Sequence, residues 1–121
     1  MNISRVSVEV FSYLTRRAVD SAGHSHPGEE SDASMAMLRI TTEDGCEGYA
    51  FGAPELLRAH LIHNFVRKVL IGQDALDRER IWQDLAHWQR GSAGQLTDRT
   101  LALVEQALWD WAGRRFQVPV Y

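Results

Sequence analysis

The 121-residue sequence has little cysteine, little proline and no long apolar run. Its single cysteine, Cys46, rules out an internal disulfide and with it a secreted disulfide scaffold, so a cytoplasmic location is expected. The first segment, MNISRVSVEVFSYL, lacks the charged start and apolar run of a signal peptide. No apolar stretch approaches the ~20 residues that cross a bilayer, so no membrane partner is expected.

An excess of charge of one sign is also missing. The sequence has 13 Lys and Arg against 16 Asp and Glu, interspersed, and a net charge of −3. A nucleic-acid-binding domain needs a basic face, so no nucleic-acid partner is expected. The hydrophobic fraction of 45% and the charged fraction of 24% are ordinary. Together with the length they predict one globular domain over residues 1–121.

The first regular pattern present is an alternation of apolar and polar residues. It runs over residues 3–14, is rich in Val and aromatic residues, and predicts a long, half-buried strand with one irregularity near Arg5 and Val6. Residues 16–34, RRAVDSAGHSHPGEESDAS, are polar and without periodicity. They predict a long loop, which in compact domains tends to be a lid or a binding loop.

Two further strands and three helices come next. Residues 35–40 and 47–51 flank an EDG turn and predict a hairpin. From Pro54 onward the apolar period changes from 2 to 3.6, which predicts a helix that ends at Gly72. A second helix begins at Asp74 or Asp77, and Thr97 caps a third. Short helices must pack to be stable, so the sequence predicts an α+β fold: a three-stranded antiparallel sheet followed by a three-helix bundle.

This order of elements resembles the N-terminal capping domain of the enolase superfamily. Within the superfamily it is similar to the branch of mandelate racemases, muconate lactonizing enzymes and acid-sugar dehydratases. The segment ALVEQALWDWAGRRFQVPVY at the end of the chain and VLIGQDALDRERIWQDL in the middle are the two most similar stretches. The most specific residues are Glu105, Gln106, Ala107, Leu108, Trp109, Asp110, Ala112, Gly113, Pro119 and Tyr121. Departures at Trp111, Phe116 and Gln117 concern packing and turns.

The resemblance implies a larger enzyme. In this family the third helix leads into a (β/α) barrel of roughly 200 residues, so residues 1–121 are expected to be a capping domain whose barrel would follow residue 121. Family members remove a proton from the carbon next to a carboxylate, with Mg²⁺ bound by the barrel as a Lewis acid. The catalytic and metal-binding positions belong to the barrel. No catalytic residue and no metal ligand is therefore assigned to this sequence.

By the same resemblance, two loops of the capping domain lie over the mouth of the barrel, exclude water and touch the distal end of the substrate. Here they correspond to residues 18–31 and 49–55. The candidate substrate-binding residues on these loops are Ser21, His24, His26 and Phe51.

Each candidate has an alternative interpretation. His24 and His26 can donate hydrogen bonds to a substrate or chelate a metal, or they can stand on a solvent-exposed turn. Phe51 is either an apolar wall of the pocket or ordinary core, and Tyr49 on the same strand face is expected in the core. Asp110 is expected to make a structural bond or salt bridge across the domain junction. Cys46 shows no sign of an activated thiolate.

The leading hypothesis is the capping and specificity domain of a Mg²⁺-dependent enzyme, first an acid-sugar dehydratase, because the polar loop suits a polyhydroxylated substrate. A mandelate racemase-like racemase and a muconate cycloisomerase-like enzyme are alternatives within the superfamily. Two other classes stay open: a non-catalytic α+β module that self-associates or binds a partner, and a small metal-binding domain that uses His24 and His26. The expected partners are the chain's own barrel, a small carboxylic acid and further copies in a homo-oligomer.

Overall fold

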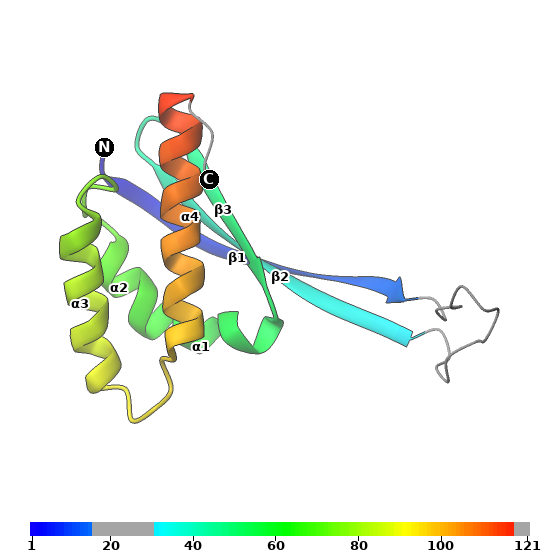
Figure 1. Cartoon of the computed structure of the whole chain (residues 1–121). Helices are drawn as coiled ribbons and strands as arrows, with labels where there is room; N and C mark the ends of the chain where they lie inside the picture. The colour runs from blue at the N-terminus through cyan, green and yellow to red at the C-terminus, as the bar shows by residue number, and fades with distance from the viewer. Residues whose placement is uncertain (16–30, 118–121) are drawn as a thin grey trace, which may run out of the picture.

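The computed structural model describes residues 1–15 and 31–117, which form an α+β fold (Figure 1). Three strands make one antiparallel sheet in the order β1-β2-β3, and the helical elements come after them in sequence. This confirms the predicted fold class. The strands are β1 (Ile3–Thr15), β2 (Ser31–Thr42) and β3 (Glu47–Gly52).

The pairing of β1 with β2 explains one predicted feature and corrects another. The register shifts between Ile3 and Arg5, which confirms the irregularity expected there. However, β2 begins at Ser31, so the predicted loop over residues 16–34 was too long at its C-terminal end. Ser34 pairs with Ser12 in the ladder. Backbone pairing does not require apolar side chains, which is why a polar segment can extend a strand.

A short 3₁₀ turn, η1 (Pro54–Leu57), follows the sheet, and a continuous helical run comes after it. The run consists of α1 (Ala59–Leu61), a π-helical segment η2 (Ile62–Val66) and α2 (Arg67–Leu70). The prediction of one helix starting at Pro54 was wrong, because Arg58 is extended with φ −60° and ψ 145°. A tertiary contact accompanies the break: the Leu56 carbonyl accepts a hydrogen bond from Thr100 Oγ1 at 2.7 Å.

The two long helices are α3 (Arg78–Arg90) and α4 (Asp98–Phe116). Thr97 caps α4 as predicted, since its Oγ1 accepts from the Thr100 N–H at 3.4 Å. Asp77 occupies the N-cap of α3 without a side-chain cap bond, and Asp74 instead accepts from the Leu76 N–H in the preceding turn. Among the helices of the described residues, none is both long and apolar enough to cross a membrane.

The helices cover one face of the sheet, and the core lies between these two layers (Figure 1). Leu38 and Ile40 of the central strand are fully buried beneath this layer. α4 buries its apolar stripe against the sheet, and Trp111 is the largest of its fully buried side chains. The Trp111 indole N–H donates to Thr42 Oγ1 at 2.9 Å, so this buried polar group is satisfied.

Beyond β3 and the helices, β1 and β2 continue as a two-stranded ribbon that projects from the body (Figure 1). Val10, Phe11 and Tyr13 on this ribbon are all exposed, Val10 by 60%. The predicted half-burial of residues 3–14 therefore holds only for the first part of β1. The alternating pattern continues along the strand, but within residues 1–15 and 31–117 no second layer covers its outer half.

Candidate functional site

The described part of the predicted site lies on the outer face of the sheet, away from the helices. Phe51 and Tyr49 lie on this face because Ala50 between them is buried against the core. Phe51 pairs with Met37 of β2, and Met37 pairs with Glu9 of β1. The other three candidates, Ser21, His24 and His26, lie outside the described residues.

Phe51 sits near the end of β3 and its side chain is 53% exposed. The alternative that it is ordinary core is therefore wrong. The strand end that carries it is packed tightly: a Cβ added at Gly52 would lie 2.6 Å from Leu103 Cδ1 of α4. The backbone of Phe51 is thus held in place while its ring faces outward, an arrangement suited to contact with a ligand or another domain.

Tyr49 was predicted in the core, and this was wrong. Its ring is half-buried on the outer face, with the Arg114 guanidinium 4.8 Å and the Arg39 guanidinium 5.7 Å from the ring centroid. The two-residue period of the strand places it on the face that no helix covers. Cation–π contacts, rather than apolar packing, shield this ring.

A charged band crosses the outer face beside Phe51. Arg39 of the central strand forms ion pairs with Glu9 of β1 at 3.2 Å and with Glu47 of β3 at 3.0 Å. Because two carboxylates already surround this guanidinium, it is poorly suited to bind a substrate carboxylate. The apolar end of the face, around Phe11 and Phe51, lies beyond this band toward the ribbon.

Asp110 makes the structural bond that was predicted, and both of its partners lie within this chain. A contact of Asp110 across the domain junction stays a prediction. Asp110 Oδ2 accepts from the Tyr49 N–H at 2.8 Å and from Arg114 Nε at 2.8 Å. The hydrogen bond to Asp110 raises the pKa of Arg114 above its ordinary value. The Asp110 carboxylate thereby accepts from a backbone N–H on the edge strand β3. An unpaired edge strand can form a ladder with another chain, and this hydrogen bond removes one of the donors that such a ladder would use.

A polar cluster at the turn between β2 and β3 holds the end of α4. Thr42 donates to Asp44, and Arg115 of α4 pairs with Asp44 at 2.9 Å. The hydrogen bond from Thr42 is the largest cause of the lowered pKa of Asp44. Burial, followed by the nearby Asp44 charge, raises the pKa of the Cys46 thiol. A thiol with a raised pKa is not an activated nucleophile, in agreement with the expectation for Cys46.

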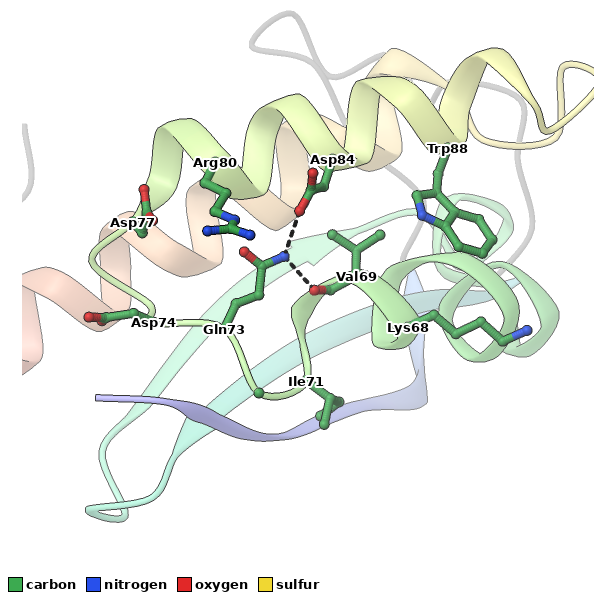
Figure 2. Close-up of a pocket in the computed structure, with 10 residues that line it drawn as sticks. Lys68, Val69, Ile71, Gln73, Asp74, Asp77, Arg80, Asp84 and Trp88 are labelled. Carbon is green, nitrogen blue, oxygen red and sulfur yellow. Dashed lines mark hydrogen bonds between the residues drawn. The ribbon is translucent and has the colours of Figure 1, made fainter.

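A separate open groove of about 610 Å³ lies between the end of α2 and the helix α3 (Figure 2). Gln73 spans it, donating to the Val69 carbonyl at 2.6 Å and to Asp84 at 3.1 Å. The groove adjoins the start of β1, since the Ile3 N–H donates to the Gln73 carbonyl. The far end of β1 is about 40 Å away at the usual rise per residue. The groove and the far end of β1 therefore belong to different parts of the molecule.

The residues described by the structure do not provide a metal site. Across residues 1–15 and 31–117, no three His, Cys, Asp or Glu side chains gather closely enough to hold an ion. This includes Asp74, Asp77 and Asp84, which all line the groove of Figure 2. The Mg²⁺ that the family resemblance implies is expected in the barrel and not among these residues. The possible metal pair His24 and His26 lies outside them.

Comparisons with known proteins agree with the fold. A D-glucarate dehydratase from Agrobacterium tumefaciens, in complex with magnesium, is 63% identical with a TM-score of 0.84, over 96% of this chain and 30% of that one. A D-galactonate dehydratase family member from Pseudarthrobacter chlorophenolicus is 39% identical over 94 residues, 73% of this chain and 22% of the relative. A 3,6-anhydro-alpha-L-galactonate cycloisomerase from Streptomyces coelicolor is 31% identical over 98% of this chain and 34% of the relative.

The chain thus spans between 22% and 34% of the length of these relatives. The family model matches almost the whole chain, from residue 7 to residue 121. That region contains almost all of the sheet and every helical element described above. The chain belongs to the family of the mandelate racemase / muconate lactonizing enzyme N-terminal domain.

Proposed function

We propose that this chain is the capping and substrate-specificity domain, over residues 1–121, of a Mg²⁺-dependent acid-sugar dehydratase. The observation that carries the proposal is the 63% identity, over 96% of the chain, to a D-glucarate dehydratase complexed with magnesium. Its partner is a (β/α) barrel, which holds the metal and the acid–base residues. This chain contributes no catalytic group. Mg²⁺, when bound by the barrel, supplies Lewis-acid stabilisation of the substrate carboxylate.

In this proposal, the chain covers the active site of the barrel and shapes its substrate pocket. Phe51, held outward by the packed end of β3, forms an apolar wall. Ser21, His24 and His26, on the loop between β1 and β2, provide hydrogen-bonding groups for substrate hydroxyls. Together they exclude water, which strengthens the electrostatic contacts in the site. The ribbon formed by β1 and β2 projects from the body (Figure 1). In this proposal, the segment that joins the two strands reaches over the barrel.

A cycloisomerase is the second candidate, favoured by the 31% identity that extends over 98% of the chain. Both reactions begin with removal of a proton next to a carboxylate. They differ in the next step: a dehydratase expels the hydroxyl on the neighbouring carbon as water, and a cycloisomerase breaks or forms a ring bond without loss of water. A racemase is a weaker alternative, because the structure of a racemase from Streptomyces coelicolor A3(2) is 27% identical.

The test is a substrate screen of the full-length protein with Mg²⁺. Aldaric acids such as D-glucarate and aldonic acids such as D-galactonate are incubated with the enzyme, and 2-keto-3-deoxy acid products are detected by semicarbazide absorbance and mass spectrometry. We expect loss of about 18 mass units, one water, from at least one aldaric or aldonic acid. Products of unchanged mass from anhydro sugars would favour the cycloisomerase. Turnover of aromatic hydroxy acids alone would reject both.

A further inference from the structure

The two long helices lie side by side with opposite directions (Figure 1), and a shallow apolar groove runs between them. Ile81 and Leu85 of α3, and Leu101, Val104 and Leu108 of α4, line its floor. The enclosed volume is only about 30 Å³, about the space of one water molecule. Such a surface is too shallow for a small-molecule site, and its flat apolar character suits contact with another protein.

Two tryptophans make this surface unusual. Trp82 lines the groove from α3 and is 46% exposed. Trp109 of α4 is 45% exposed and contacts Arg78, which also lines the groove. Trp111, in contrast, is fully buried in the core. Trp88 packs edge-on against Phe65 at 6.1 Å. Large exposed Trp side chains next to an apolar groove are the residues that most often anchor protein–protein contacts.

The charges at the groove are self-complementary. Arg78 lines it from α3 and Glu105 lines it from α4. The Arg78 guanidinium lies 3.6 Å from the Trp109 ring centroid, which holds it at the surface. Among the described residues, Arg78 and Glu105 form no ion pair with each other. A two-fold rotation would bring Arg78 of one copy to Glu105 of the other, and the reverse, because a two-fold interface uses the same patch twice.

We propose that the Trp82–Trp109 surface is a two-fold interface with a second copy of this chain. The tryptophans supply the buried contacts, and two symmetric Arg78–Glu105 pairs set the orientation. The proposal is independent of the reaction class proposed above, since the groove belongs to α3 and α4 and contains none of the candidate substrate-binding residues. The barrel domain is the competing occupant of this surface.

The first test measures the assembly of the full-length protein by sedimentation velocity. Trp82→Glu combined with Trp109→Glu is expected to shift the protein to the next smaller assembly, because charged side chains would be buried at the interface. Ile71→Glu is the matched control: Ile71 is 40% exposed but lies in the groove of Figure 2 rather than between α3 and α4. The control is expected to keep the wild-type assembly.

The second test exchanges the charges. Arg78→Glu alone and Glu105→Arg alone should each raise the dissociation constant of the assembly roughly tenfold, because like charges then face each other twice. Mixing the two single variants should restore the wild-type value, since each mixed pair again places opposite charges together. The double variant, Arg78→Glu with Glu105→Arg, should restore it as well.

Three outcomes would overturn the proposal. In the first, the tryptophan variant keeps the mass of the wild type. In the second, the double variant regains the wild-type dissociation constant but the mixture of the two single variants does not. This would mean that the two charges interact within one chain. In the third, the tryptophan variant keeps its assembly but loses thermal stability and turnover, which would assign the surface to the barrel. The substrate screen is unaffected by any of these results.

Discussion

Single residues decide how closely α4 approaches the sheet, and Gly48 of β3 is the clearest case. A Cβ added there would lie 2.6 Å from the Trp111 Cβ and would also collide with the Ala107 carbonyl oxygen. Both obstacles belong to the backbone side of α4 and cannot rotate away. Glycine at this position is therefore required by close packing, which in turn lets the Trp111 indole reach Thr42.

Gly48→Ala is accordingly expected to lower the free energy of unfolding by about 3 kcal/mol, since an overfilled core must shift its backbone. Chemical denaturation followed by circular dichroism measures the change. Gly91→Ala is the control, because a Cβ at Gly91 would meet only the Trp88 carbonyl at 3.7 Å and its φ of −88° suits any residue. Equal loss of stability in the two variants would refute the packing argument.

At the scale of elements, the turn between β2 and β3 holds the last turn of α4. Asp44 on this turn accepts from Thr42 and pairs with Arg115, and Trp111 donates to the same Thr42. Gln117, the C-cap of α4, adopts a left-handed conformation with φ 56°. These contacts fix the place where α4 ends, and thus the direction in which the chain leaves this domain.

The lowered pKa of Asp44 makes this contact sensitive to acid. A carboxylate whose pKa is lower in the folded state stabilises the fold at pH values above its ordinary pKa of 3.8, and that contribution disappears as the pH falls through the folded-state pKa. We expect Asp44→Asn to melt a few degrees below wild type at pH 7, and this difference to narrow as the pH falls below 3.8.

Thermal melts by circular dichroism from pH 2 to pH 7 provide the measurement. The other carboxyl groups titrate in both proteins, so the difference between the two curves isolates Asp44. Glu43→Gln, at the exposed neighbouring position, serves as the control and should follow wild type throughout. If the difference in melting temperature between wild type and Asp44→Asn stayed constant down to pH 2, the charge of Asp44 would not contribute to the stability of the fold.

At the scale of the whole molecule, the described residues present two exposed apolar surfaces on different parts of the fold. One lies on the outer face of the sheet and the ribbon, around Phe11, Tyr13 and Phe51, and the other lies between α3 and α4. An isolated two-stranded ribbon is only marginally stable in water, so the first surface needs a cover. The barrel is the proposed cover for the ribbon, and a second copy is the proposed cover for the helices.

If the first surface caps the barrel, Phe51 contacts the substrate without taking part in the chemistry. Phe51→Ala is then expected to raise KM about tenfold, equivalent to about 1.4 kcal/mol, and to change kcat little. Steady-state kinetics on the best acid from the substrate screen measure both constants. Alanine at His24 and His26 should also raise KM. Leu76→Ala, at a side chain that is 50% exposed near the start of α3, is the control and should leave both constants unchanged.

The outcome for Phe51 distinguishes a substrate contact from a structural role. A variant that loses kcat as strongly as kcat/KM, or that melts at a lower temperature than Leu76→Ala, would contradict the role proposed for this side chain. It would indicate instead that the ring packs against the barrel and positions the two domains.

The sequence alone was enough to predict the order of the strands and helices, though not all of their bounds, because the signals are local. Alternation indicated the strands, the change to a 3.6-residue period at Pro54 indicated the helices, and Thr97 marked the start of α4. The same local signals identified the irregularity at Arg5. Two characteristic segments then pointed to the family that the comparison confirms.

The surroundings of each side chain were decided only by the tertiary structure. Tyr49 and Phe51 have the same alternation as core residues, yet they lie on a sheet face that no helix covers. Likewise, a hydrogen bond from Thr100, 44 residues away in sequence, accompanies the break of the helix after Leu56. Periodicity tells which residues share a face. Which face is buried, and which bonds form across the fold, depends on elements that meet only after folding.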